Sequence, residues 1–243
     1  MQFKDFIPLV LGERNAGRLE YILRKRSADH VRRPFNGQQG RQNIWLEMLK
    51  RMEFSAVVET GTFRGSTTLF LVQSGLPIYT VEISPRYYEY SALCLRRHRN
   101  QVHLSEGDSR DFLRKAARHM GCPKSRVFFY LDAHWGNDLP LREEVEIIFE
   151  NWTDSVAMID DFAVPGMDYG YDDYGPGRRL NMEYLLPVVD ELQLIPFFPS
   201  FGPDGETGFK RGCVVLCRED GIADRLKGID LLSAYLPGSA RGE

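Results

Sequence analysis

Three aspartates directly follow apolar, strand-like stretches of the chain and carry its clearest chemistry. Asp132 follows the run at residues 126–131, and the pair Asp160 and Asp161 follows the run at 156–159. In an open parallel sheet the carboxyl ends of the strands border the ligand crevice, so these carboxylates are expected to converge there. Carboxylate oxygens are the ligands that hard divalent cations prefer. The three residues therefore predict a chemical site at the crevice.

The elements that would position these aspartates alternate along the chain. Apolar runs predict strands at residues 55–59, 78–83, 101–105, 126–131 and 156–159. Helical spacing of apolar residues predicts helices between them, at 66–74, 86–98, 109–120 and 140–150. This alternation is typical of right-handed βαβ units, which build a parallel sheet with helices on both faces.

The N-terminal part of the chain has a different character. Apolar residues with helical spacing at 44–52 predict a helix that leads into the first strand. Residues 1–43 are polar, basic and weakly periodic, with a break from Pro34 to Gly40. We expect residues 1–43 to form a helical N-terminal extension or lid beside a single globular domain.

The C-terminal part is expected to complete that domain, which spans residues 44–243. After residue 185 the sequence predicts a helix and two apolar runs, 192–198 and 212–217, separated by a Gly- and Pro-rich connection. These runs would pair as an antiparallel hairpin at the edge of the sheet. The predicted fold is α/β, with a Rossmann-like, doubly wound and mostly parallel seven-stranded sheet.

Glycines and acidic residues follow the first three expected strands in a pattern that suits a nucleotide. The first strand runs into Glu-Thr-Gly-Thr-Phe-Arg-Gly at residues 59–65, whose glycines allow a tight turn and close approach to a ligand. Glu82 ends the second strand, where an acidic side chain takes ribose hydroxyls in related folds. Asp108 and Ser109 follow the third strand and could meet a purine amine, although they also suit a helix N-cap. The dinucleotide spacing Gly-x-Gly-x-x-Gly is absent, which disfavours an NAD-dependent oxidoreductase.

The ordered series of motifs resembles the class I S-adenosylmethionine-dependent methyltransferases, and most closely the metal-dependent O-methyltransferases of the catechol and antibiotic-sugar types. The motif at 59–65 is similar to their first motif, Val-Glu-Ile-Ser-Pro to their ribose motif, and Glu-Gly-Asp-Ser-Arg-Asp to their adenine motif. Leu-Asp-Ala-His-Trp and Ile-Asp-Asp-Phe-Ala-Val-Pro-Gly resemble their two metal motifs. The resemblance covers residues 38–166, and its order is more specific than any single motif.

Carried over to this chain, the resemblance implies a set of contacts to S-adenosylmethionine. Glu59, Gly61 and Thr67 would surround its methionine part, Glu82 its ribose, and Asp108 with Ser109 its adenine. The full set of expected cofactor-binding residues is Glu59, Gly61, Thr62, Gly65, Thr67, Glu82, Asp108, Ser109 and Asp132.

The resemblance also implies that Asp132, Asp160 and Asp161 hold Mg²⁺ or another hard divalent cation. Asp132 and Asp160 would end adjacent parallel strands and so could share an ion. Asp161 follows where the chain leaves the strand and need not alternate faces. A cation there would act as Lewis acid and template, aligning an acceptor hydroxyl behind the methyl group of the sulfonium. Asp132 is therefore also a candidate catalytic residue.

His134 is the candidate general base, since a neutral imidazole can take a proton near neutral pH. The resemblance leaves its role open. Antibiotic-sugar enzymes carry an Asp at this position, whereas catechol enzymes have a His-Trp pair that contacts adenine and is followed by a Lys. Here Ala133 is inserted and Gly136-Asn137 stand where that Lys would fall. A base, an adenine contact and a structural histidine all remain alternatives.

A long Gly-, Tyr- and Asp-rich connection at residues 162–182 follows the aspartate pair. Connections of this length often serve as lids or binding loops, although a plain surface loop is the alternative. Tyrosines in it could stack on a sugar or aromatic acceptor, and arginines could meet an anionic group. The expected acceptor-binding residues are Tyr169, Tyr171, Tyr174, Arg178 and Arg179.

Composition excludes several other classes of protein. A net charge of −3 and a pI near 6.0 provide no general attraction to nucleic acid, and no apolar run reaches membrane-spanning length. The four cysteines show no Cys-x-x-Cys spacing, so a zinc site is disfavoured. With no signal-peptide pattern at the start, we expect a cytoplasmic protein. A homodimer formed through the N-terminal segment is a further expectation.

The leading hypothesis is an S-adenosylmethionine- and Mg²⁺-dependent O-methyltransferase that acts on a small hydroxylated acceptor, such as a sugar or secondary metabolite. One alternative is a metal-independent class I methyltransferase with a different acceptor. Another is a non-catalytic scaffold that retains the fold, which the intact aspartate trio disfavours because neighbouring carboxylates repel without a cation. A nucleic-acid methyltransferase is disfavoured by the lack of an Asn/Asp-Pro-Pro-Tyr/Phe motif.

Overall fold

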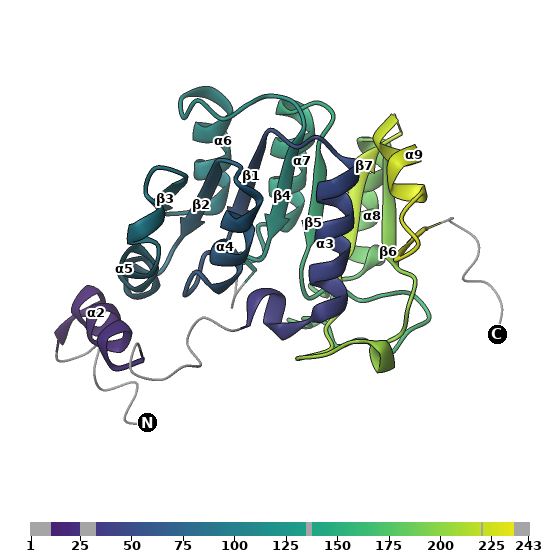
Figure 1. The fold of residues 1–243 in the computed structure, drawn as a ribbon. Helices are drawn as coiled ribbons and strands as arrows, with labels where there is room; N and C mark the ends of the chain where they lie inside the picture. Colours follow the sequence, from purple (N-terminus) through teal and green to yellow (C-terminus); the bar gives the residue numbers. More distant parts are fainter. Residues whose placement is uncertain (1–10, 25–32, 135–137, 220, 236–243) are drawn as a thin grey trace.

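One eight-stranded sheet organises the part of the chain that the computed structural model describes, residues 11–24, 33–134, 138–219 and 221–235. Its strand order is β3-β2-β1-β4-β5-β7-β6-β8 (Figure 1). The strands are β1 (Ala56–Thr60), β2 (Ile78–Glu82), β3 (Val102–Glu106), β4 (Val127–Leu131), β5 (Val156–Ile159), β6 (Leu194–Pro199), β7 (Val214–Arg218) and β8 (Leu232–Ala234).

The first five strands in the chain are parallel, and the last three form the antiparallel part of the sheet. β1 pairs with β2 and β4, and the parallel pairing extends to β3 on one side and β5 on the other. β7 pairs antiparallel with both β5 and β6. The predicted Rossmann-like α/β fold is confirmed, including the antiparallel hairpin of β6 and β7.

The sheet has one strand more than the seven expected. The three-residue β8 pairs with β6 and covers the edge at which the hairpin was predicted to end the sheet. A three-residue strand after Gly228 carries too little apolar alternation to be recognised from sequence. It shields an edge whose free N–H and C=O groups would otherwise be exposed.

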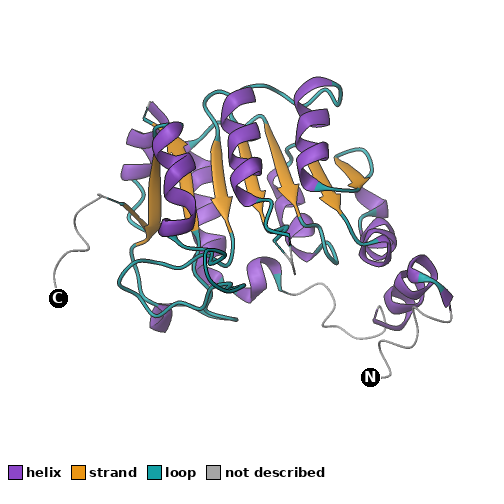
Figure 2. Ribbon diagram, turned by 180° about the vertical axis from the view of Figure 1, so that it is seen from behind, coloured by secondary structure: helices purple, strands orange, loops and turns teal. Residues whose placement is uncertain are grey.

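Helices cover both faces of the sheet, as Figures 1 and 2 show from opposite sides. α6, α7 and α8 pack on the face that carries Ala56, Val58 and Phe129. α3, α4 and α9 pack on the other face, which carries Val57 and Phe128. The helices are α2 (Glu13–Arg24), α3 (Gln39–Arg51), α4 (Ser66–Leu71), α5 (Pro85–Cys94), α6 (Ser109–Arg118), α7 (Leu141–Asn151), α8 (Met182–Glu191) and α9 (Gly221–Lys227), with short 3-10 turns η1 (Pro34–Gly37), η2 (Val72–Ser74), η3 (Arg96–His98) and η4 (Pro203–Gly205).

The expected break before the first core helix is shorter than predicted. α3 begins at Gln39 and includes Gly40, so the helix crosses the proposed domain boundary at residue 43. A Cβ atom at Gly40 would lie 2.4 Å from the Phe201 ring and 2.5 Å from a Glu206 carboxylate oxygen. Glycine at this position permits close packing within α3. In the sequence alone, the same glycine resembles a break in the chain.

The more distant part of the expected extension forms α2, which lies against α5 at the β3 side of the sheet (Figure 1). Glu20 of α2 is 2.7 Å from guanidinium nitrogens of both Arg64 and Arg86. Residues 1–10 and 25–32 of the predicted extension lie outside the described residues. Whether residues 1–43 act as a separate lid stays a prediction.

The sheet brings the aspartates to one edge because its hydrogen bonds continue past the strand ends. The Asp132 amide donates to the Thr60 carbonyl, and the Asp160 amide donates to the Leu131 carbonyl, both at 3.0 Å. Both aspartates therefore stand at the carboxyl ends of adjacent strands, beside the point where the strand order reverses between β1 and β4. This is the position at which ligands bind in open α/β sheets.

Candidate functional site

A pocket of about 400 Å³ opens at the carboxyl ends of β1, β2, β3 and β4. Gly61 follows β1 with φ +87°, and a Cβ atom there would lie 2.2 Å from the Asp132 carbonyl oxygen, so only glycine fits. The residues that line the pocket are Asn36, Gly61, Phe63, Val81, Glu82, Ile83, Ser84, Tyr87, Gly107, Asp108, Ser109, Asp132, Ala133, Asp138, Pro140 and Asp161.

Glu82 lines this pocket and is held in place by backbone amides. Its carboxylate accepts hydrogen bonds from the amides of Phe63 at 2.7 Å and Ser84 at 2.8 Å. Burial raises the pKa of Glu82, and these amides oppose the shift by favouring the charged form. A fixed acidic acceptor at the end of β2 suits the hydroxyls of a ribose.

Asp108 and Ser109 also line the pocket, and Asp108 does so while capping α6. Its carboxylate accepts from the Arg110 amide at 2.8 Å and from the Arg110 guanidinium at 2.6 Å. The hydrogen bonds from Arg110 hold the pKa of Asp108 below its ordinary value. Asp108 can therefore serve in both roles, because its carboxylate caps α6 and also borders the pocket in which a ligand would bind.

Four expected cofactor residues lie behind the pocket wall instead of lining it. Glu59 and Thr62 are buried beneath it, and Gly65 is the left-handed N-cap of α4. The Thr67 hydroxyl accepts a hydrogen bond from the Phe35 amide at 3.1 Å, which ties η1 to α4. These residues shape the loop that carries Gly61, and a direct cofactor contact from any of them stays a prediction.

Glu59 is expected to make the stability of the protein depend on pH near neutrality. It is 1% exposed and accepts hydrogen bonds from Thr68 and Thr80 at 2.6 Å, yet burial raises its pKa to about 7. Because the folded carboxyl binds its proton more tightly than the unfolded one, the free energy of unfolding should fall as pH rises from about 4.5 through 7.

Glu59→Gln removes this titration. The free energy of unfolding of the variant minus that of wild type should be larger at pH 8 than at pH 5 by on the order of 2 kcal/mol. Urea denaturation at both pH values measures the change, with the exposed Glu53→Gln as control. A wild-type minus variant difference that is the same at both pH values would show that Glu59 does not titrate in this range.

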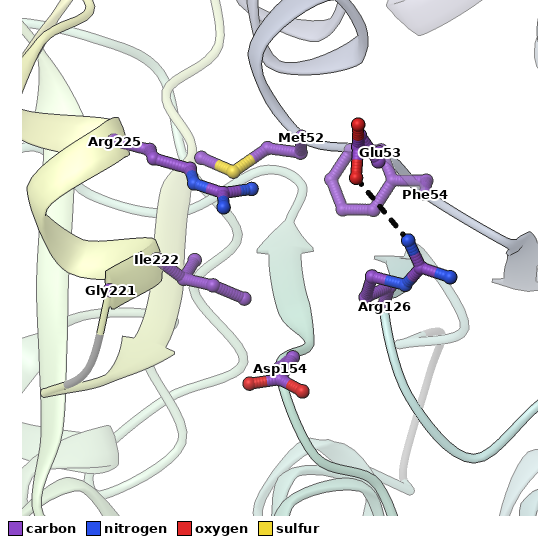
Figure 3. A pocket seen from close by; sticks show the side chains of 8 residues that line it. All are labelled: Met52, Glu53, Phe54, Arg126, Asp154, Gly221, Ile222 and Arg225. Carbon is purple, nitrogen blue, oxygen red and sulfur yellow. Dashed lines mark hydrogen bonds and ion pairs between the residues drawn. The ribbon is translucent and has the colours of Figure 1, made fainter.

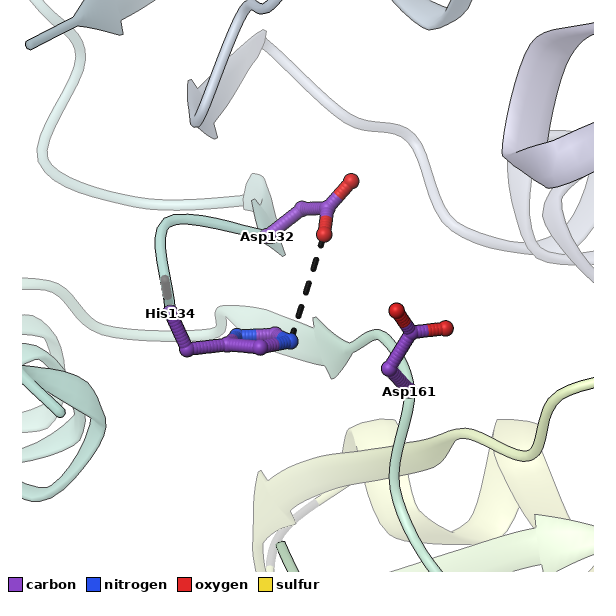
Figure 4. Close-up of side chains that lie close together, drawn as sticks. All are labelled: Asp132, His134 and Asp161. Atoms are coloured by element: carbon purple, nitrogen blue, oxygen red, sulfur yellow. Dashed lines mark ion pairs between the residues drawn. The ribbon is translucent and has the colours of Figure 1, made fainter. Parts of the chain in front are cut away.

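Asp132, His134 and Asp161 form a group whose donor atoms all lie within 4.8 Å of one another. Figure 4 shows the His134 imidazole reaching toward Asp132, with Asp161 on the other side of the same gap. The His134 Nε2 atom is 4.0 Å from Asp132 Oδ1. Two carboxylates and one imidazole at this spacing are a donor set that suits a divalent cation.

Asp161 joins this group because its backbone is left-handed. Its φ is +51°, a conformation that aspartate tolerates better than most residues. The reversal turns its carboxylate into the pocket, while the preceding Asp160 points away into the protein. The expectation that Asp161 need not alternate faces is consistent with this geometry.

Asp160 is the one member of the predicted trio outside this group. It is fully buried and forms an ion pair with Arg41, which is 1% exposed. Its carboxylate also accepts hydrogen bonds from the Tyr130 hydroxyl and, at 3.3 Å, from the Asn36 amide nitrogen. The backbone amide of Asp161 donates to the remaining oxygen at 2.7 Å. With both oxygens engaged, Asp160 supports the site from beneath, and cation binding by it stays a prediction.

Two further charged residues, Arg211 and Asp172, lie next to the group. Arg211 Nε is 2.6 Å from Asp161 Oδ1, and the same guanidinium pairs with Asp172. The Tyr174 hydroxyl oxygen lies 2.5 Å from the His134 carbonyl oxygen and 2.6 Å from an Asp172 carboxylate oxygen, and its single proton is donated to one of them at a time. Tyr174 therefore ties the long connection to the turn that carries His134, and Arg211 ties the connection to Asp161.

The electrostatics of the group follow from burial and like charge. Burial, and then the neighbouring Asp161 carboxylate, raise the pKa of Asp132 well above its ordinary value. Burial lowers the pKa of His134, although Asp161 and Asp172 oppose this shift. The imidazole is therefore neutral near pH 7 and has a lone pair for a proton or a cation. Its ring is absent from the pocket lining, which does not favour an adenine contact.

The residues of the expected acceptor loop lie in different environments. Tyr174 contacts the site, whereas Tyr169 is 5% exposed and donates to the Phe201 carbonyl at 2.8 Å, so its ring cannot stack on an acceptor without moving. Tyr171 is exposed, and Arg179 pairs with Asp173 at 2.9 Å on the surface. Arg178 lies 6.0 Å from the Tyr174 ring centre. Acceptor binding by these residues stays a prediction.

The sequence analysis did not single out four residues of the site, Arg41, Arg211, Asp172 and Asn36. Its argument about His134 also used residues 135–137, which lie outside the described residues. A signal for Arg41 was present. It shares a helix face with Ile44, Trp45 and Met48, all of which are buried. A charged residue on the apolar face of a helix indicates a buried ionic partner.

A smaller pocket of about 240 Å³ lies at the opposite edge of the sheet, by the amino ends of β1 and β4 (Figure 3). It contains none of the predicted site residues. Its one drawn interaction joins Glu53 and Arg126 at 3.4 Å. Because the carboxyl ends of the strands carry the acidic group and the larger pocket, the crevice is the candidate functional site.

The cysteines and helices of the described residues add no second site. All four cysteines are free thiols, and burial raises the pKa of Cys94 and Cys122 to about 11. None of the helices in the described ranges is long and apolar enough to cross a membrane.

Comparisons with known proteins identify the fold. No protein-family model and no curated protein sequence matches the chain. An O-methyltransferase from Bacillus cereus in complex with SAH is similar, with a TM-score of 0.52 and 15% identity over 88% of this chain and 95% of that one. The O-methyltransferase TomG from Streptomyces achromogenes, solved with SAM and involved in tomaymycin synthesis, has a TM-score of 0.50 and 16% identity over 75% of this chain and 80% of that one.

A methyltransferase domain of bacterial CtHen1 shares the same architecture, with a TM-score of 0.51 and 14% identity over 73% of this chain and 96% of that one. Similarity at such low identity concerns the fold. The chain therefore has the fold of the class I S-adenosylmethionine-dependent methyltransferases, as its motifs indicated.

Proposed function

We propose that this protein is an S-adenosylmethionine-dependent O-methyltransferase that acts on a small hydroxylated acceptor with the help of a divalent cation. The observation that carries the proposal is the continuity of two sites. One pocket is lined both by Gly61, Glu82 and Asp108 and by Asp132 and Asp161. A cofactor bound along the first three residues would direct its methyl group toward the two carboxylates.

The donor set fits a cation. Burial, and then repulsion from the nearby Asp161 carboxylate, raise the pKa of Asp132, and a divalent cation between the two carboxylates would remove that repulsion. The carboxylates of Asp132 and Asp161 would hold it, and His134 lies beside them. When bound, such a cation stabilises an alkoxide or phenoxide and fixes its position.

The residues of the chain account for the remaining requirements of methyl transfer. The acceptor hydroxyl would lose its proton to solvent water, and its oxygen would form a bond to the methyl carbon as the carbon–sulfur bond breaks, which leaves S-adenosylhomocysteine. Arg41 keeps Asp160 and the floor of the site fixed. The connection that carries Asp172 and Tyr174 lies against the turn of His134 and would limit water there.

Cofactor binding tests the first half of the proposal. Isothermal titration with S-adenosylmethionine should show binding to the wild-type protein, and Glu82→Gln should weaken it about tenfold by removing a charged hydrogen-bond acceptor. The matched control is Glu106→Gln, which changes a carboxylate at the end of the neighbouring strand that lies outside the pocket lining and pairs with Arg14 at 2.5 Å. No binding to wild type at millimolar cofactor would refute the proposal.

One observation favours a second candidate, a metal-independent methyltransferase of the same fold. Arg211 already places a positive charge 2.6 Å from Asp161 Oδ1. If this guanidinium were the permanent partner of the carboxylate, a chelator would leave methyl transfer unchanged. Loss of activity with EDTA and its recovery on adding divalent cation support the first candidate over the second.

A further inference from the structure

His134 is a buried polar group beside the crevice whose ring lacks hydrogen-bond partners within the described part of the chain. Its side chain is 1% exposed, yet neither ring nitrogen has a hydrogen-bond partner among the described residues. Its backbone carbonyl accepts from the Tyr174 hydroxyl at 2.5 Å, so the turn that carries the ring is anchored. A buried imidazole without partners is costly unless a ligand completes it.

Resting on the proposed cation-dependent function, we propose that His134 is a direct ligand of the cation and that the site therefore selects manganese-like divalent ions over Mg²⁺. This assignment replaces both the base and the adenine contact expected from the sequence. The same Nε2 lone pair cannot bind a cation and accept a proton at once.

The neighbouring carboxylates leave room for this ligand. Both Asp160 oxygens are engaged, by Arg41 and the Asp161 amide on one and by Tyr130 and Asn36 on the other. Both Asp172 oxygens are engaged as well, by Arg211 and Tyr174. Asp132 and Asp161 supply the carboxylate oxygens of the group, and the Asp161 oxygen is shared with Arg211 Nε at 2.6 Å. His134 Nε2 lies 4.0 Å from Asp132 Oδ1 and 3.9 Å from Asp172 Oδ2.

Charge and donor type point to the class of ion. Two carboxylates balance a divalent charge, and the neutral imidazole adds a third ligand without further charge. Mg²⁺ prefers oxygen-only surroundings, whereas Mn²⁺, Fe²⁺ and Co²⁺ accept imidazole nitrogen readily and bind mixed sites more tightly. A nitrogen in a set of three protein ligands therefore moves the preference away from Mg²⁺.

Pulsed electron paramagnetic resonance of the full-length protein with bound Mn²⁺ tests the assignment directly. The wild-type spectrum should show coupling to a coordinated histidine nitrogen, identified by its change when histidine alone is labelled with ¹⁵N. His134→Gln should abolish this coupling, whereas His119→Gln should keep it, because His119 is exposed at the end of α6.

Affinities provide a second readout that does not depend on the variant folding. In wild type, titration calorimetry should give a dissociation constant for Mn²⁺ at least about tenfold below that for Mg²⁺. Equal affinities, or bound Mn²⁺ without histidine coupling, overturn the assignment while leaving a cation-dependent function in place. Methyl transfer that continues at the full rate in the presence of EDTA overturns both the assignment and the metal half of the proposed function.

Discussion

Replacing Arg41 with methionine is expected to lower the free energy of unfolding by about 3 to 5 kcal/mol, because it leaves the buried Asp160 carboxylate without its guanidinium partner. Arg41 is 1% exposed and Asp160 is fully buried, so water cannot replace the lost partner. The guanidinium also donates to the Gly212 carbonyl at 2.8 Å, and that contact is lost as well. Urea denaturation near pH 7 measures the change.

The double variant Arg41→Met with Asp160→Leu separates charge from packing. With both charges removed, much of the lost stability should return, because an apolar pair needs no compensation in the interior. The exposed pair Glu47 and Lys50, at 2.7 Å, is the control, and Lys50→Met there should cost less than about 0.5 kcal/mol. A single Arg41→Met variant as stable as wild type would show that the Asp160 charge is neutralised in another way.

The outline of the fold could be predicted because each local pattern agreed with its neighbours. The apolar run at 156–159 was predicted as a strand and matches β5, and the helical spacing at 140–150 matches α7 within one residue. Elements whose formation depends on distant contacts could not be found in this way. Gly40 resembled a break, yet it belongs to α3 because Phe201 and Glu206 approach it closely.

The candidate site was predictable in location but not in the direction of its side chains. Strand ends located Asp132, Asp160 and Asp161 at the crevice, since parallel strands end at one edge. Which of the adjacent pair faces the pocket depends on the left-handed backbone of Asp161 and on the distant Arg41 that holds Asp160. Neither fact is visible in the local sequence, although the position of Arg41 on an apolar helix face was a clue.

The contrast between the adjacent aspartates leads to the strongest expected effect on function. Asp161→Asn should weaken binding of a divalent cation by about 100-fold, since the charge of the ligands largely sets the affinity of such sites. It should lower methyl transfer to a hydroxylated acceptor by a similar factor. Binding of S-adenosylmethionine should change less than about threefold, because its expected contacts lie around Glu82 and Asp108. Asparagine keeps the shape of the side chain and tolerates the φ of +51°.

Asp168→Asn in the same connection is the matched control, since Asp168 is exposed and should affect neither ligand. Arg211→Gln should act in the opposite direction and tighten cation binding about tenfold, because its guanidinium lies 2.6 Å from Asp161 Oδ1 and competes for that oxygen. Calorimetric titrations of the three variants with Mn²⁺ and with cofactor measure both effects. If Asp161→Asn and Arg211→Gln leave cation affinity unchanged, Asp161 belongs to a structural ion pair, and the metal-independent reading of the site becomes the better one.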